Sequence, residues 1–360
     1  MKPHLNDSEW FDDDPRWSLP SPYDPPGEVE EDPDAPEGVA AWDLPLPRAD
    51  RRDLLDVDPW RRAEAALAAD LARAAQALGR LDEAVRRVGQ GAAERLAYRE
   101  VEAMLRADGR WLDRDRIGRA QLDAGGDPDR VRDLERARWA LRRLTASPGV
   151  PSDLRRFLGR HRPAWQGDPL LAERVTLDAA VDDVQHAWQE VLDRSAHLHP
   201  ITQGCAALRA WRLLDVSGEG EGLDGAVMAS RIAAREHRAL GFVPLAPAGQ
   251  SWRRGGAVLD VLRLWMAEVR SGALSALADL DRAADWREQA TARVADLGGR
   301  NPAKVLAVLA ARPYVSAADV AETATVSRDT AERILRTFEQ RGLVHEITGR
   351  GRFRLWRATV

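Results

Sequence analysis

The residues best suited to chemistry lie in the last sixty positions of the chain, where arginines and small hydroxyl residues gather. Guanidinium groups pair with phosphate oxygens and, bidentately, with guanine, and Thr hydroxyls contact polar base edges. Duplex DNA is therefore the partner that these residue types fit best. The predicted DNA-binding residues are Ser327, Arg328, Asp329, Thr330, Arg333, Thr337, Arg350, Arg352 and Arg354.

A second candidate site is the run over residues 199–207, which reads His-Pro-Ile-Thr-Gln-Gly-Cys-Ala-Ala. His197 and His199 could form a metal pair, with His186 upstream. No cysteine cluster or Glu-x-x-His spacing accompanies them, because Cys205 is the only cysteine of the chain. The sequence therefore predicts no metal site, no cofactor and no catalytic residue.

Helix caps and apolar spacing predict the elements that position the arginines. Residues 303–312 predict a helix that Pro313 ends, and Ser316 caps a short helix over 317–323. Ser327 caps a third helix, which runs to residue 340 or 341 before Gly342. Its apolar residues recur at helical spacing and predict one buried stripe, formed by Ala331, Ile334, Leu335 and Phe338.

Two alternating runs, 343–348 and 353–356, are joined by glycine-rich residues and predict a β-hairpin. Three helices followed by a hairpin resemble a winged helix–turn–helix domain. In that resemblance the third helix reads the DNA groove, and the tip of the wing carries Arg350 and Arg352. Arg354 and Arg357 are expected to extend this basic strip. The turn before the third helix usually contains glycine where Thr325 stands, and a β-branched residue is costly there, which favours a differently wound turn. Winged helices also serve as dimerisation or protein-docking modules, so that alternative stays open.

The rest of the chain predicts two further parts. Residues 1–50 form an acidic, proline-rich tail, with 13 acidic residues against Lys2 and Arg16 up to position 47. Such a tail is expected to be disordered, as solvated chain or as a docking segment whose aromatic residues contact a protein partner. Residues 51–299 predict an all-helical body with no strand before residue 340, and residues 300–360 the winged helix. The body helices are expected over residues 58–81, 91–109, 131–144, 169–195, 203–216, 225–240 and 256–297.

Composition excludes several classes of protein. Mean hydropathy is −0.44, and no stretch approaches the ~20 apolar residues of a membrane helix. The first residues contain a run of acids and no apolar segment, unlike a signal peptide. A single cysteine cannot form an internal disulfide, which favours the reducing cytoplasm.

Several body segments resemble the Fic (filamentation-type) fold. Residues 78–83 resemble its opening helix, and residues 100–109 lie where its inhibitory helix stands. His199, Pro200 and Gly204 match the catalytic motif of that family, but Gln203 replaces the acid that binds Mg²⁺. A neutral amide is a poor Mg²⁺ ligand, so the resemblance implies a body that has lost its phosphate site.

The whole arrangement resembles a plasmid-borne bacterial family of unknown function, with a degenerate Fic-like body and a C-terminal winged helix–turn–helix. The predicted fold class is mainly α, with a multi-helical body and a small β-hairpin. The predicted function is DNA binding for transcriptional or plasmid regulation, with the body providing homodimerisation or sensing. The alternative is a divergent Fic-type nucleotidyl or phosphoryl transferase that uses His199 and docks through the winged helix.

Overall fold

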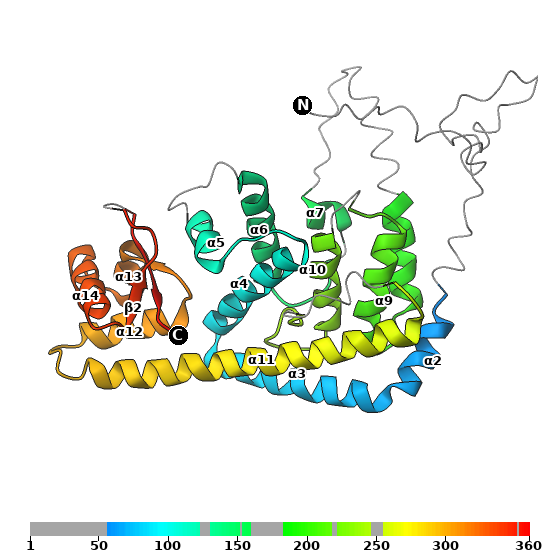
Figure 1. Ribbon diagram of the computed structural model, residues 1–360, viewed down its shortest axis with the longest axis horizontal. Coiled ribbons are helices and arrows are strands. Elements are labelled where there is room, and N and C mark those ends of the chain that lie inside the picture. Colours follow the sequence, from blue (N-terminus) through cyan, green and yellow to red (C-terminus); the bar gives the residue numbers. More distant parts are fainter. Residues whose placement is uncertain are drawn as a thin grey trace, which may run out of the picture. The chain divides into compact units, whose positions relative to one another are not determined.

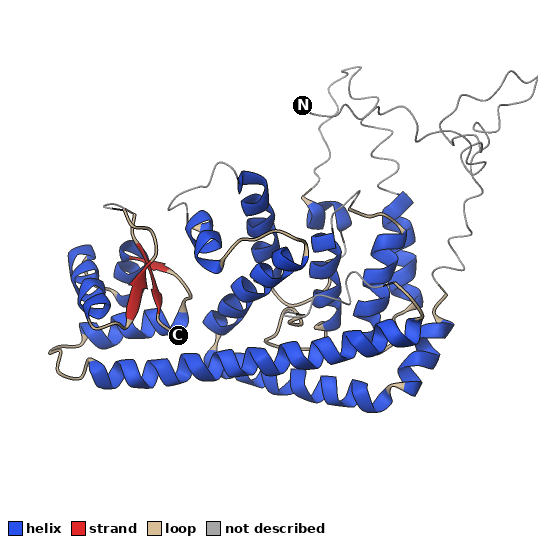
Figure 2. Ribbon diagram, viewed as in Figure 1, coloured by secondary structure: helices blue, strands red, loops and turns tan. Residues whose placement is uncertain are grey.

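The computed structural model describes residues 56–122, 130–151, 153–159, 183–217, 222–245, 255–350 and 353–360. These residues are mainly helical and contain a three-stranded antiparallel sheet (Figures 1 and 2). Asp50–Val360 form one compact unit, so residues 300–360 pack onto the helical body. The predicted acidic tail, residues 1–50, lies outside the described residues.

The first helical segment is broken once. Helix α2, Asp58–Ala66, ends at Leu67, and α3, Ala68–Val88, begins directly after it, whereas the apolar spacing predicted one continuous helix. Asp58 is the first residue of α2, and Val57 before it makes no side-chain cap. Pro59 stands in the first turn, where its missing N–H costs no intrahelical hydrogen bond.

The next helices follow the predicted spans closely. Helix α4, Gln90–Ala107, ends before Gly109 at φ 78°, and α6, Val131–Leu144, has the predicted bounds. Residues 183–194 are helical within the longer span that was expected. The remaining helices of this region are α5, Arg114–Gln121, α7, Leu154–Leu158, α9, Pro200–Leu213, and α10, Gly222–Ala233.

Helices α9 and α10 pack closely through glycines. A Cβ on Gly204 would lie 2.7 Å from the Ala229 carbonyl oxygen, and one on Gly225 would lie 2.8 Å from the Trp211 ring. Only glycine allows this approach, so these residues bring two largely buried helices together. The predicted helix over 225–240 begins earlier and ends at Ala233.

The long helix α11, Val258–Arg293, runs from the body to the C-terminal elements (Figure 1) and contributes to two hydrophobic cores. Its first part packs along α3 and contributes Trp265, which is fully buried, to the core of the body. Its last part contributes Trp286 to a second core, which residues 300–360 complete. One 36-residue helix, ~54 Å long, thus supports both the body and the C-terminal elements.

The C-terminal elements are three helices and the sheet. Two residues form β1, which was not expected, because a two-residue strand is too short to show alternation. It pairs with β3, and β3 pairs with β2, so Trp356 lies in the central strand with 1% of its surface exposed. The bounds are α12, Asn301–Ala311; β1, Val315–Ser316; α13, Ala317–Ala324; α14, Arg328–Gln340; β2, Val344–Glu346; and β3, Leu355–Ala358.

The turn between α13 and α14 has the ordinary left-handed conformation, contrary to expectation. Thr325 has φ 55° and ψ 57°, and Val326 N–H donates to the Ala321 carbonyl at 3.0 Å. A non-glycine residue in this conformation costs ~1–2 kcal/mol. The hydrogen bonds that end α13 and the Ser327 cap that begins α14 hold the turn and offset that cost.

Replacing Thr325 with glycine is expected to stabilise the protein. Thr325 is exposed, so its side chain loses little packing, and glycine removes the left-handed strain at a smaller entropic cost. We expect the free energy of unfolding to rise by about 0.5–1 kcal/mol, measured by urea denaturation. Thr323→Gly is the matched control, because Thr323 is exposed inside α13, where glycine should cost roughly 0.3 kcal/mol. Equal effects of the two changes would contradict this account.

None of the described helices combines the length and the apolar character needed to cross a bilayer.

Candidate nucleic-acid interface

Helix α14 presents one face to the second core and the other to solvent. Its apolar stripe, Ala331, Ile334, Leu335 and Phe338, is buried as predicted. Ser327 caps the helix, since its side chain accepts the Thr330 N–H at 3.2 Å. The buried stripe fixes the rotation of α14 about its axis, so the opposite face and the first turn are free to meet a partner.

The predicted contact residues of α14 differ in how available their polar groups are. Arg328 and Arg333 are exposed, and neither side chain makes a hydrogen bond or ion pair within the described part of the chain. Thr330 accepts a 2.8 Å hydrogen bond from Ser327, and Thr337 donates one of 2.9 Å to the Arg333 carbonyl. The exposed Asp329 adds a negative charge to the first turn. The two guanidinium groups are therefore the strongest candidate contacts of the helix.

One residue that the sequence analysis missed lies on the same face. Arg336 follows Arg333 by three positions, so the two share one side of α14. Arg336 is exposed and pairs with Glu332 one turn back. The i, i+3 spacing of the two arginines was the sequence signal that could have identified it.

The loop between β2 and β3 is organised by Glu346. Its carboxylate accepts the backbone N–H of Thr348 at 2.7 Å and that of Gly349 at 3.0 Å. Burial raises the pKa of Glu346, but these hydrogen bonds outweigh it and hold that pKa below its ordinary value. The loop therefore leaves β2 in a fixed direction while Glu346 stays ionised.

The loop arginines are placed unequally. Arg350 is exposed, and its carbonyl accepts a 2.9 Å hydrogen bond from Arg354, whose side chain is half-buried. Phe353 stands beside them with 73% of its surface exposed. The third predicted contact of this segment, Arg352, lies outside the described residues.

Arg357 was expected to extend the basic strip, and that expectation is wrong. Its guanidinium faces α5 and pairs with Asp115 at 3.1 Å, and Asp115 also accepts the Tyr314 hydroxyl at 3.0 Å. These partners lie about two hundred positions apart in sequence, so no local pattern could show the contact. Arg357 contacts α5 of the body and does not belong to the outward face of α14.

The segment around His199 is a buried helix start. His199 caps α9, because its Nδ1 accepts the Ile201 N–H at 3.2 Å, and its own N–H donates to the Glu64 carboxylate at 3.0 Å. Gln203 donates to the Leu192 carbonyl at 3.0 Å and to Ser195 Oγ at 3.1 Å. Cys205 is fully buried, which raises the pKa of its thiol. These groups serve packing and capping, and the Glu64 carboxylate already stands where a phosphate would approach the helix N-terminus.

The cap predicts a pH dependence of stability. Burial lowers the pKa of His199 below its ordinary value of 6.5, and Nδ1 accepts the Ile201 N–H only when it is unprotonated. Just below pH 6.5 the unfolded chain therefore binds more protons than the folded chain, so the free energy of unfolding decreases as the pH falls. This stabilising contribution is complete above that pH and is lost as the pH falls through the lowered pKa.

The measurement is the free energy of unfolding between about pH 5 and pH 8, for the native chain and His199→Asn. Asparagine caps helices well and does not titrate. The native chain should lose stability towards acid more steeply than the variant. Parallel profiles would show that His199 is not the titrating cap.

His197, the second histidine considered as a metal ligand, makes a structural contact. Its Nε2 accepts a hydrogen bond from Arg61 Nε at 3.4 Å, and the described residues contain no group of three metal-ligating side chains.

No protein-family model matches the chain, and no curated protein shows significant sequence similarity to it.

Proposed function

We propose that the chain is a sequence-specific duplex-DNA-binding protein, in which residues 300–360 act as a winged helix–turn–helix. Helix α14 would enter the major groove, and the loop between β2 and β3 would contact the backbone beside it. In this proposal the chain regulates transcription or a plasmid function in the cytoplasm. The helical body supplies homodimerisation or sensing, as a degenerate relative of the Fic fold, and the acidic tail can contact a protein partner.

The observation that carries the proposal is the pair of exposed guanidiniums on α14 that make no ion pair within the described part of the chain. Arg328 stands in the first turn and Arg333 on the outward face, on a helix whose rotation is fixed by the buried stripe. Side chains at the start of a recognition helix read base edges, and Arg does so bidentately. Arg350 on the neighbouring loop adds a cation suited to a phosphate.

The charge of α14 also favours sequence-specific over sequence-independent DNA binding by this helix. Arg328, Arg333 and Arg336 are balanced along α14 by the acids Asp329, Glu332 and Glu339. A helix with no net charge gains little from the phosphate field, so its arginines act by geometry. The cations of the loop supply the sequence-independent attraction.

The experiment is a selection of bound fragments from the source genome and from a random duplex library with the full chain. The proposal predicts a shared motif in the selected fragments and tighter binding to it than to random duplex, typically by a factor of 10³ or more. Recovery of fragments without a motif would show binding through charge alone. No recovery at low salt would show that residues 300–360 dock a protein instead.

The alternative activity, group transfer by His199, finds little support in the geometry. The imidazole is committed to Ile201, and the helix start behind it is apolar and buried. Incubation of a lysate with labelled ATP, with the native chain or His199→Ala, separates the two functions. Label transfer that is lost in the variant would favour the transferase, while no transfer by either agrees with the DNA-binding proposal.

A further inference from the structure

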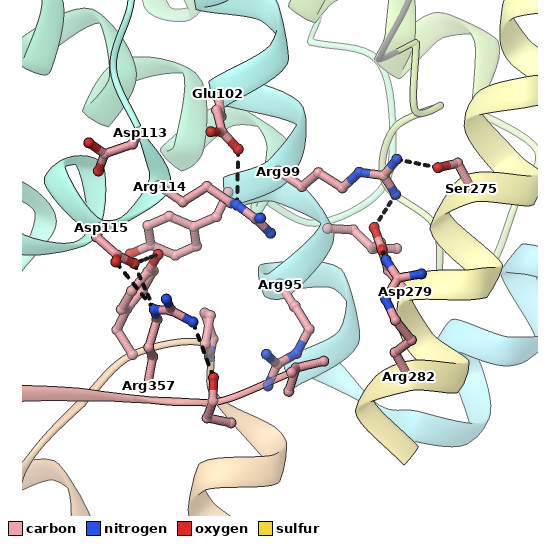
Figure 3. A pocket seen from close by; sticks show the side chains of 16 residues that line it. Arg95, Arg99, Glu102, Asp113, Arg114, Asp115, Ser275, Asp279, Arg282 and Arg357 are labelled. Carbon is pink, nitrogen blue, oxygen red and sulfur yellow. Dashed lines mark hydrogen bonds and ion pairs between the residues drawn. The ribbon is translucent and has the colours of Figure 1, made fainter. Parts of the chain in front are cut away.

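A polar cavity of about 430 Å³ lies between the body and the C-terminal strand β3 (Figure 3). Helices α4, α5 and α11 form its walls on one side, and Pro313, Tyr314 and Arg357 close it on the other. It is separate from the outward face of α14 and from the capped start of α9. The proposed DNA-binding function does not use this cavity.

The lining of the cavity contains more arginines than carboxylates. Five arginines face four acids, and most of them form pairs. Arg114 lies 2.9 Å from Glu102, and Arg99 and Arg282 both contact Asp279. The lining arginines are Arg95, Arg99, Arg114, Arg282 and Arg357, and the acids are Glu102, Asp113, Asp115 and Asp279.

Arg95 is the exception among these arginines. Within the described part of the chain no carboxylate lies at ion-pair distance from it. Its Nη2 donates to three backbone carbonyls at the end of α12, that of Ala310 at 3.3 Å and those of Leu309 and Arg312 at 3.5 Å. A largely buried guanidinium without a counter-charge is costly unless another anion completes it. Arg95 therefore has carbonyl partners but no carboxylate in an ion pair with it.

Neighbouring charges act on Arg95 in both directions. Burial lowers the pKa of Arg95, Tyr314 and Glu94 raise it in part, and the positive charge of Arg114 lowers it. In Figure 3, Arg95 on α4, Arg114 on α5 and Arg357 on β3 line the same cavity. Three elements thus place guanidinium groups around it, of which Arg114 pairs with Glu102 and Arg357 with Asp115.

We propose that this cavity binds a small molecule with a phosphoryl group, held between Arg95, Arg114 and Arg357. A phosphoryl group offers three oxygens to guanidinium donors on different walls of the cavity, whereas a carboxylate offers two in one plane. Tyr98, Tyr314 and Leu96 provide apolar wall for the organic part of such a ligand. The inference does not depend on the proposed DNA binding, because it concerns the free protein.

The test is calorimetric titration of the full chain with pyrophosphate, inorganic phosphate and succinate at matched ionic strength. Pyrophosphate should bind, and succinate should bind at least about tenfold more weakly. Arg114→Gln should weaken pyrophosphate binding by about tenfold or more, and Arg95→Gln should do the same. The matched control is Arg116→Gln, because Arg116 is two positions from Arg114 on α5, pairs with Asp113 and does not line the cavity. It should stay within about twofold of the native chain.

Arg114→Gln is the decisive variant, since Arg114 pairs only with Glu102 among the described carboxylates and its side chain is 53% exposed. Arg95→Gln also loses the carbonyl contacts of Arg95, so its pyrophosphate binding is interpreted only if a cooperative thermal melt shows that the variant folds. Absence of pyrophosphate binding, equal binding of succinate, or equal loss in Arg114→Gln and Arg116→Gln would each overturn the proposal. If pyrophosphate does not bind and Arg114→Gln instead weakens random-duplex binding, the cavity belongs to a DNA-contact surface and the small-molecule site is refuted.

Discussion

Replacing Arg328 or Arg333 with alanine will weaken binding to the preferred duplex by ~1–3 kcal/mol, about 5- to 150-fold, and binding to random duplex far less. Both guanidiniums leave α14 where base edges would lie, and neither is paired within the described part of the chain. Neither residue is part of the buried stripe, so the melting temperature should change little. The measurement is fluorescence anisotropy with the two duplexes at equal salt.

The loop arginines should give a different pattern. Removing Arg350 and Arg352 together should weaken binding to all sequences about equally and flatten the salt dependence by up to ~0.9 for each lost phosphate contact. Arg263→Ala is the control, because Arg263 is an exposed arginine of α11 that pairs with Asp260 and lies outside the proposed interface. Loss of specificity from the loop variant, or an unchanged salt slope, would show that the roles of loop and helix are assigned wrongly.

Gly91→Ala should be the most damaging single change in the body. A Cβ at this position would lie 1.5 Å from the Ala311 carbonyl oxygen at the end of α12. Because a backbone atom cannot rotate away, α4 and α12 must separate, and Arg95 would lose its carbonyl contacts at the same place. We expect a loss of about 3 kcal/mol or more in the free energy of unfolding, measured by urea denaturation.

Gly79→Ala is the matched control for that change. Gly79 lies inside α3, and a Cβ there would meet no atom within 4 Å. Alanine in an open helical position should stabilise the chain by about 0.5–1 kcal/mol. If Gly91→Ala is as stable as Gly79→Ala, the close contact between α4 and α12 does not exist in solution.

The parts of the fold that could be predicted are those set by local chemistry. Helix α6 has its predicted bounds, Ser316 and Ser327 cap the helices that follow them, and Gly342 has φ 69° after α14. Each depends on a cap, a stop or a 3.6-residue period within a few positions. The stripe of α14 was predictable for the same reason.

What escaped prediction depends on distant partners. Strand β1 exists because it pairs with β3, forty residues further on, and not because of its own two residues. Arg357 was assigned to DNA from its neighbours in sequence, whereas Asp115 on α5 determines where it points. The cavity around Arg95 likewise combines residues from opposite ends of the chain. Such contacts leave no mark in local periodicity.

The most direct test of the central claim removes Arg328, Arg333, Arg350 and Arg352 together from the full chain. Binding of native and variant protein to the selected duplex is compared over a range of salt, with circular dichroism melts of both. The account predicts at least about 100-fold weaker binding at an unchanged melting temperature. Equal affinity of the two proteins for the selected duplex would contradict it, and residues 300–360 would then be a protein-docking module.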